Sequence, residues 1–279
     1  MIRKMLSHEL AEVREIGEEV KAVAKDEIPT LVKYADAALY LIETTKEIGK
    51  LVIGNRELDN RKSDWCSLID YDKNGETKVL AAALYRFGGM TFESALNYVK
   101  SLDESQRIQL ADTLLKRLDE HDVPLRELEY ATYTFDLVMD QGAYAEFKRH
   151  RMMTQTPQML TTRLGYATPR LITESGFRSE YEAAMESAAK MFEKLYQFNP
   201  QVAQYVVPNG YNRRVLVQFN LREAYHFCQL RGASNAHFSI RKIAHRVAEE
   251  LQRVHPALTR FMHLPDETWQ SVEEKYFAK

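Results

Sequence analysis

Helical periodicity covers most of the sequence and leaves room for only a small sheet. Apolar residues recur at helical spacing over 8–25, 30–52, 78–101, 104–121, 139–153, 176–197, 221–230 and 236–254. Only 11 Gly and 8 Pro interrupt the 279 residues. Residues 129–137 and 214–219 instead alternate and are rich in β-branched and aromatic residues, which is typical of strands. We therefore predict an α+β fold, mostly helical, with helices packed around a small antiparallel sheet.

A polar segment divides the chain at 53–77, which predicts an N-terminal helical extension over 1–77 and a main domain over 78–279. The extension contains an echo of the C-terminal region, because Arg, Ile, Val, Pro and Leu recur at the same offsets in 13–34 and 240–261. Two interpretations are open. Two amphipathic helices that end at a proline resemble one another by chance, or the N-terminus is the remnant of a preceding copy of the same domain.

Composition excludes several classes of function. A formal net charge of −2 gives no overall attraction to nucleic acid or to an anionic membrane. No stretch approaches the roughly 18 apolar residues of a membrane span, and the first residues lack the apolar core of a secretory signal. Two cysteines, Cys66 and Cys228, show no metal-ligand spacing and favour a reducing compartment. We expect a cytoplasmic protein without a metal site.

The sharpest local feature is a basic run, Arg149-His150-Arg151, followed by Thr161 and Arg163. Arg149 and Arg151 are two residues apart in a predicted helix, so their side chains should point in different directions and meet different anions. Guanidinium groups suit phosphate and carboxylate oxygens because their planar donors are permanently charged. The simpler interpretation is a solvated basic helix end.

A second cluster follows the second predicted strand. Asn220 is an N-cap type of residue that opens a helix, and Arg222, His226 and Arg231 follow in that helix. Asn220, Arg222, His226 and Arg231 are candidates to line the mouth of this helix near the sheet, although an ordinary charged surface is also open. The sequence has no glycine-rich phosphate loop, no G-x-S-x-G elbow and no His-Glu-x-x-His pair. Cys228 is most simply a small buried hydrophobe.

Together the two clusters resemble the flavin-dependent thymidylate synthase family (ThyX). The family combines an Arg-His-Arg motif with a downstream Asn-x-Arg-x-x-x-(His/Asn)-x-x-x-x-Arg block, and this chain has both in the same order. The resemblance covers about 115–265. It implies a homotetramer with FAD sites between subunits, and reductive methylation of dUMP to dTMP with methylenetetrahydrofolate and NADPH. It also implies FAD contacts from Arg149, His150, Arg151, Asn220, Arg222 and His226, and dUMP contacts from Arg149, Thr161, Arg163 and Arg231.

The sequence departs from the family pattern at several of the expected contacts. Met159 stands at the family's Ser position, Glu146 replaces a Gln just before Arg-His-Arg, and Gln204 replaces an Arg. Three hypotheses follow: a variant synthase with weak turnover, a paralogue that only binds nucleotide or flavin, and a structural copy that pairs with an intact subunit.

Overall fold

The computed structural model describes residues 1–52 and 64–278 and divides the chain into two compact units. The N-terminal unit holds the described residues before Asp64 together with Met191–Tyr205. The sheet unit holds Asp64–Lys190 and the residues from Val206 onward. The domain boundary that we placed at residue 77 stays a prediction.

The sheet unit is built on a four-stranded antiparallel sheet in the order β1-β2-β4-β3. Its strands are β1 (Cys66–Tyr71), β2 (Thr132–Asp140), β3 (Thr154–Pro157) and β4 (Asn212–Asn220). The two central strands, β2 and β4, confirm the alternating patterns seen in the sequence. The predicted fold class, mostly helical around a small antiparallel sheet, is confirmed.

The two outer strands correct the sequence-based prediction. The polar segment 53–77 was expected to be a connection, yet β1 lies within it, while residues 53–63 are outside the described residues. The strand β1 is six residues long with a bulge between Leu68 and Asp70, so it has no clean alternation. The strand β3 has four residues and ends at Pro157, which is tolerated because β3 lies at the edge of the sheet.

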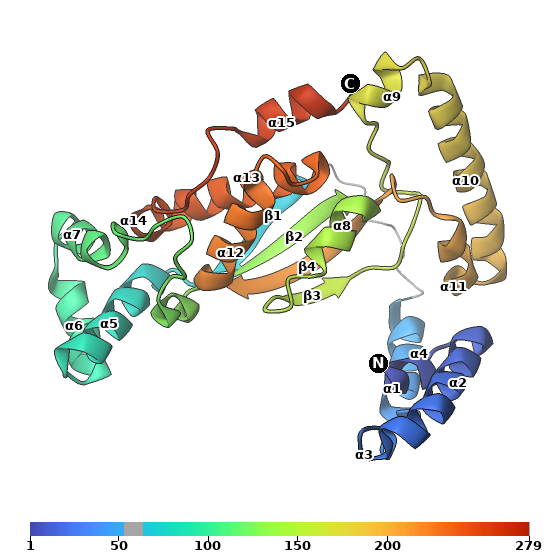
Figure 1. The fold of residues 1–279 in the computed structure, drawn as a ribbon, viewed down its shortest axis with the longest axis horizontal. Helices are drawn as coiled ribbons and strands as arrows, with labels where there is room; N and C mark the ends of the chain where they lie inside the picture. The colour runs from blue at the N-terminus through green and yellow to red at the C-terminus, as the bar shows by residue number, and fades with distance from the viewer. Residues whose placement is uncertain (53–63, 279) are drawn as a thin grey trace. The chain divides into compact units, whose positions relative to one another are not determined.

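Helices surround the sheet, and in Figure 1 α12 and α13 lie along one face of it. The helices that follow β1 in the described chain are α5 (Gly75–Gly88), α6 (Phe92–Ser101), α7 (Glu104–Leu115), η2 (Arg126–Tyr130), α8 (Gln141–Phe147), α9 (Arg170–Glu174), α10 (Arg178–Phe198), α11 (Pro200–Ala203), η3 (Gln204–Val206), α12 (Leu221–Gly232), α13 (Phe238–Val254), α14 (Pro256–Thr259) and α15 (Trp269–Tyr276).

Three predicted helices are shorter than the periodicity suggested. The helix expected over 78–101 is broken at Gly89, whose φ of 65° forms a left-handed C-cap after α5. The helix expected over 139–153 begins after Asp140 and ends at Phe147, so Arg149 and Arg151 are not in a helix. The helix expected over 104–121 ends at Leu115.

The N-terminal unit begins with α1 (Ile2–Leu6), α2 (Ala11–Glu27), α3 (Pro29–Val32) and α4 (Leu39–Val52). The single helix expected over 30–52 is therefore two helices. Between them the chain leaves the helical path, and the backbone N–H of Ala38 donates to Oγ of Ser7 at 2.8 Å. Because that hydroxyl replaces a helical carbonyl as the acceptor, apolar periodicity alone did not reveal the break.

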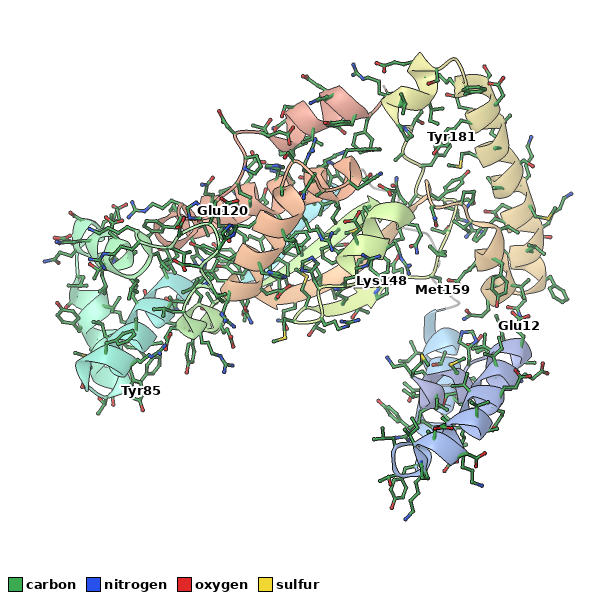
Figure 2. All side chains as sticks on the ribbon, in the orientation of Figure 1. Glu12, Tyr85, Glu120, Lys148, Met159 and Tyr181 are labelled. Carbon is green, nitrogen blue, oxygen red and sulfur yellow. The ribbon has the colours of Figure 1, made fainter. Side chains whose placement is uncertain are left out.

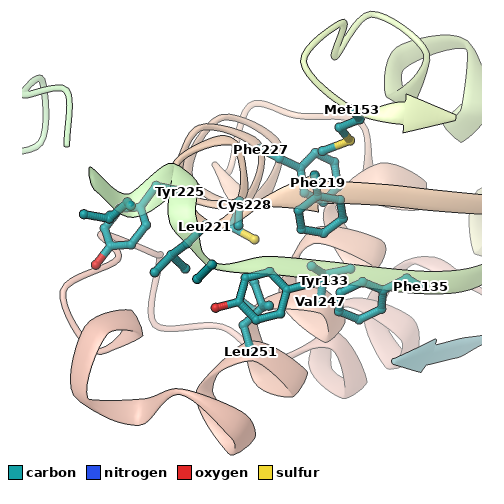
Figure 3. Close-up of a cluster of buried hydrophobic side chains, with 14 of the residues drawn as sticks. Tyr133, Phe135, Met153, Phe219, Leu221, Tyr225, Phe227, Cys228, Val247 and Leu251 are labelled. Atoms are coloured by element: carbon teal, nitrogen blue, oxygen red, sulfur yellow. The ribbon is translucent and has the colours of Figure 1, made fainter. Parts of the chain in front are cut away.

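The core of the sheet unit lies between the sheet and the helices on one face. Figure 3 shows Tyr133 and Phe135 of β2 near Val247 and Leu251 of α13. The Tyr133 hydroxyl pairs with Nδ1 of His255 at 2.6 Å, and His255 is buried. Helix α5 begins at Gly75 directly against this pair, where a Cβ would lie 2.6 Å from Cε1 of His255. Only glycine allows this close approach.

The substitution Gly75→Ala should lower the free energy of unfolding by about 1–3 kcal/mol, the usual cost of overpacking a core. The added Cβ would also lie 2.9 Å from Cβ of Ala131, so it meets the core on two sides. Urea denaturation measures the change. Gly88→Ala is the matched control at the other end of α5, where the nearest atom is 3.5 Å away; it should not destabilise the protein. Equal stability of Gly75→Ala and wild type would contradict the packing described.

Candidate functional site

The candidate site is organised by the junction where β4 ends and α12 begins. Asn220 is the last residue of β4 and the N-cap of α12, and its Oδ1 accepts the backbone N–H of Glu223 at 2.9 Å. An Asn cap satisfies one of the donors left free in the first turn of a helix. The predicted role of Asn220 as an N-cap is confirmed.

Beside this junction lies a cleft with a volume of about 1060 Å³. One wall is formed by α12 and its N-cap, which contribute Arg222 and His226 from the helix and Asn220 from the cap. The opposite wall consists of residues 120–124 and Glu129, and further lining comes from Ser234, Asn235, Met152 and residues 263–265. Three of the four residues that the second sequence cluster singled out therefore share one cleft.

Arg222 is held in place at the cleft wall. Its Nε donates to the backbone oxygen of Pro124 at 3.0 Å, and one terminal nitrogen lies 3.0 Å from Oε1 of Glu129. Glu129 also pairs with Arg126, and the hydrogen bonds from Arg126 and Arg222 hold the pKa of its carboxyl below the usual value. The guanidinium of Arg222 consequently joins the two walls of the cleft.

The fourth residue, Arg231, does not line the cleft, which corrects the expectation that it shares the mouth with Asn220, Arg222 and His226. Its Nε donates to Nε2 of His150 at 3.1 Å, and a terminal nitrogen forms an ion pair with Glu146. His150 is buried, and its Nδ1 lies 3.0 Å from Oε1 of Glu223. We call these four residues, Glu146, Arg231, His150 and Glu223, the inner network.

The inner network determines which nitrogen of His150 carries a proton. An arginine Nε is always a donor, so Nε2 of His150 must accept. The proton therefore lies on Nδ1, which donates to the carboxylate of Glu223. The ring is further fixed by an edge contact with Phe227, at 5.1 Å between ring centres. His150 acts here as a bridge between α12 and the turn after α8.

Arg149 and Arg151 lie on either side of His150 in that turn, and both are exposed. Their side chains have no hydrogen bond or ion pair to any residue that the structure describes. The prediction that Arg149 and Arg151 diverge because they lie in a helix was wrong, because α8 ends before them at Phe147. His150 between them is buried, while both arginines are exposed. Figure 2 shows Lys148, at the start of this turn, well separated from Glu120 on the cleft wall.

Thr161 and Arg163 lie in the loop after β3, where the Arg163 backbone N–H donates to Oγ1 of Thr161 at 3.1 Å. Neither belongs to the cleft lining.

Sequence reasoning did not single out Asn235 and His263, which line the cleft from the α12–α13 connection and from the segment after α14. Neither carries a local signal, since only the tertiary fold brings them to α12.

The cysteines and possible metal ligands add no chemistry to this region. Cys66 and Cys228 are both buried free thiols, and burial raises the pKa of each. A protonated buried thiol is a poor nucleophile. Within residues 1–52 and 64–278, no group of three or more His, Cys, Asp or Glu side chains is placed to hold a metal ion. In the same residues, no helix is long and apolar enough to cross a membrane.

The chain is similar in sequence to several known proteins. Over 278 residues, the chain is 31% identical to a UPF0159 protein of Chlamydia muridarum, covering 95% of this chain and 52% of the relative. A UPF0159 protein of Thermoplasma acidophilum is 25% identical over 276 residues, covering 95% of this chain and 54% of the relative. The chain thus spans about half the length of these relatives.

A third relative is a flavin-dependent thymidylate synthase of Sulfurisphaera tokodaii. It is 30% identical over 207 residues, which is 70% of this chain and 76% of the relative. The model of the thymidylate synthase complementing protein family matches residues 67–257. This range contains β2 to β4, all of β1 except Cys66, the cleft wall of α12 and the inner network. The chain belongs to this family, the family of the flavin-dependent thymidylate synthases.

Proposed function

We propose that the chain carries out the family's reaction, the reductive methylation of dUMP to dTMP with methylenetetrahydrofolate and NADPH, using FAD. The observation that carries the proposal is that Asn220, Arg222 and His226 line one large cleft. Its volume of about 1060 Å³ is at the upper end of the range for ligand pockets, roughly 300–1,000 Å³. A cleft of this size has room for a cofactor rather than for a small metabolite alone.

The cleft lining fits the ring systems of a flavin better than its pyrophosphate. Apolar side chains for a ring to lie against come from Val123, Pro124, Leu230 and Leu264, and polar donors come from Gln229 and Asn235. The charges are less suitable for an anion, because four carboxylates line the cleft against one guanidinium, that of Arg222; they are Glu120, Asp122, Glu129 and Glu223. A pyrophosphate therefore needs cations from outside the cleft.

Arg149 and Arg151 can provide those cations if a second subunit presents them. Both are exposed and without partners among the described residues, and neither belongs to the lining of the cleft in their own chain. Guanidinium groups without a carboxylate partner are well suited to bind phosphate oxygens. We therefore propose a homo-oligomer, a tetramer by analogy with the family, in which Arg149 and Arg151 complete the FAD site of a neighbouring copy. The buried His150 serves that site by holding the turn between them.

When bound, FAD reduced by NADPH supplies the hydride of the family's reaction. The residues of this chain hold and orient the ligands, because both thiols are buried and an enzyme nucleophile is not required. Arg149, Thr161, Arg163 and Arg231 are our proposed contacts for dUMP. Two buried free cysteines agree with a cytoplasmic location, which we propose on that ground.

One observation favours a second function, a copy that binds ligand weakly or serves as a structural partner of an intact subunit. Glu146 forms an ion pair with Arg231 inside the inner network. A guanidinium that already pairs with a carboxylate must exchange that partner before it binds a phosphate. In this alternative the fold and the cleft persist while turnover is lost.

Titration of the purified chain with FAD separates these functions. We expect saturable changes in the flavin absorbance spectrum, in a sample whose mass by light scattering exceeds that of one 32.4 kDa chain. Binding should weaken about tenfold or more in Arg222→Ala, because the hydrogen bonds that fix the cleft walls are lost. A monomer without flavin binding would contradict the proposal and favour the structural copy.

The substitution Glu146→Gln should tighten the binding of dUMP about tenfold to hundredfold. It removes the carboxylate that competes for Arg231, and a hydrogen bond to a charged group contributes about 1.5–3 kcal/mol. Calorimetric titration with dUMP measures the change. Glu182→Gln is the matched control, since it removes one carboxylate from an exposed ion pair with Arg178. Equal affinities of wild type and Glu146→Gln would show that Arg231 does not bind the nucleotide.

A further inference from the structure

The echo between the two ends of the sequence is also an echo in structure. Helix α2, Ala11–Glu27, and helix α13, Phe238–Val254, both have 17 residues. The short helices that follow, Pro29–Val32 and Pro256–Thr259, both have four. A single offset relates both pairs, since 238 − 11 and 256 − 29 are each 227. The repeat therefore extends over two helices and the residue that joins them.

The joining residues share an uncommon backbone conformation. Ile28 has φ −136° and ψ 55°, and His255, at the same offset, has φ −137° and ψ 59°. The backbone N–H of Ile28 donates to Ala24 at 2.8 Å, and that of His255 donates to Leu251 at 2.9 Å. Ile28 and His255 each precede a proline, which by itself restricts the backbone at that position. The preserved offset of 227 and the equal helix lengths do not follow from a proline alone, and they favour the repeat interpretation.

The equivalence continues on both sides of the helix pair. After α3 the Ala35 N–H donates to Val32 at 2.9 Å, and after α14 the Met262 N–H donates to Thr259 at 3.1 Å, again at the offset of 227. Before the helices, the guanidinium of Arg14 donates to the backbone oxygen of His8 at 2.8 Å. Its counterpart Arg241 donates to the backbone oxygen of Ser234 at 2.7 Å, an acceptor that lies one residue before the counterpart of His8. Both arginines tie their helix to the loop that precedes it.

Burial is where the two copies differ. In the sheet unit, Ile243 is 3% exposed and Leu258 0%, because α13 lies against the sheet and α12. Their counterparts in the N-terminal unit, Ile16 and Leu31, are 51% and 78% exposed. Further large apolar side chains of α2 and of the junction are exposed at Val23 and Ile28. We call the surface formed by Ile16, Val23, Ile28 and Leu31 the α2 face.

We propose that the α2 face is a docking surface for the sheet, with its α12-type helix, of a second unit of this fold. The geometry identifies the occupant, because in the sheet unit α13 packs against β1, β2 and α12. Helix α12 also reaches α14, where the Tyr225 hydroxyl donates to the backbone oxygen of Leu258. The sheet of another copy of this chain cannot bind the α2 face, because the α13 of that copy already covers the same side of the sheet. The relatives from Chlamydia muridarum and Thermoplasma acidophilum leave about half of their length outside the aligned region, which is room for such a unit.

Burial of the α2 face should contribute appreciably to such an association. Covering large aliphatic side chains removes apolar surface from water, which favours association, and docking would cover Ile16, Val23, Ile28 and Leu31 together. An exposed patch of this kind on a helix pair is typical of an interaction surface.

A fusion tests the proposal in the full chain. A second copy of residues 64–227 is placed directly before Met1, so that Met1 takes the position of Cys228 and the offset of 227 is preserved. Docking should slow amide hydrogen exchange in α2 and α3 about a hundredfold relative to the unfused chain, because exchange then requires the docked helices to open. Unchanged exchange in a fusion whose added sheet is folded would overturn the proposal.

Two substitutions show whether the α2 face itself is responsible. In the fusion, Ile16→Asp should abolish the slowing of hydrogen exchange in α2 and α3, because its counterpart Ile243 lies in the core. Ala22→Asp places the same side chain on the same helix where the counterpart, Glu249, is exposed, and it should leave the slowing unchanged. Equal effects of the two substitutions would count against docking through this face.

The Chlamydia muridarum relative provides a second measurement if the added sheet aggregates. Its segment aligned with Ala11–Val32 should exchange as slowly as its segment aligned with Phe238–Thr259. Fast exchange of the first segment alone would overturn the proposal. A dimer of the unfused chain that Ile16→Asp dissociates would also overturn it, because the face would then join two copies of this chain.

Discussion

The antiparallel pairing of β2 with β4 positions nearly everything else in the sheet unit. Nine residue pairs run from Thr132 opposite Asn220 to Asp140 opposite Asn212. Each strand ends in a helix cap: Asn220 begins α12, and Asp140 begins α8 by accepting the Ala143 N–H at 2.8 Å. Because the strands are antiparallel, the two helices start from opposite ends of the ladder. The ladder thereby fixes where Glu146 and His150, from α8 and its turn, meet Glu223 and Arg231 of α12.

The inner network is the consequence of that arrangement. In it, Arg231 pairs directly with Glu146 and is linked to Glu223 through the buried imidazole of His150, so Arg231 is satisfied within the chain. Arg149 and Arg151, next to the same imidazole, lack such partners among the described residues. The structure therefore separates arginines that stabilise the fold from arginines that are free to bind an anion. This separation is the physical basis for expecting flavin binding to persist while nucleotide binding is weakened.

The sequence predicted the parts of this account that depend on local patterns. Alternation predicted β2 and β4, and the Asn type at residue 220 predicted the start of α12. It missed β1 and β3, which are short and have weak alternation. It could not assign Glu146 to Arg231, because the two are 85 residues apart and meet only through the fold. The similarity between α2 and α13 could be recognised in the sequence, but the shared backbone conformation at Ile28 and His255 is known only from the structure.

We propose that the cleft and the inner network together form a synthase site that works slowly. Tritium release from labelled dUMP, with FAD, NADPH and methylenetetrahydrofolate present, tests it most directly. The Sulfurisphaera tokodaii relative is the reference. We predict flavin-dependent release at least about tenfold slower than the reference, equivalent to about 1.4 kcal/mol or more of lost transition-state binding. No release from a chain that binds flavin, or release as fast as the reference, would contradict the account.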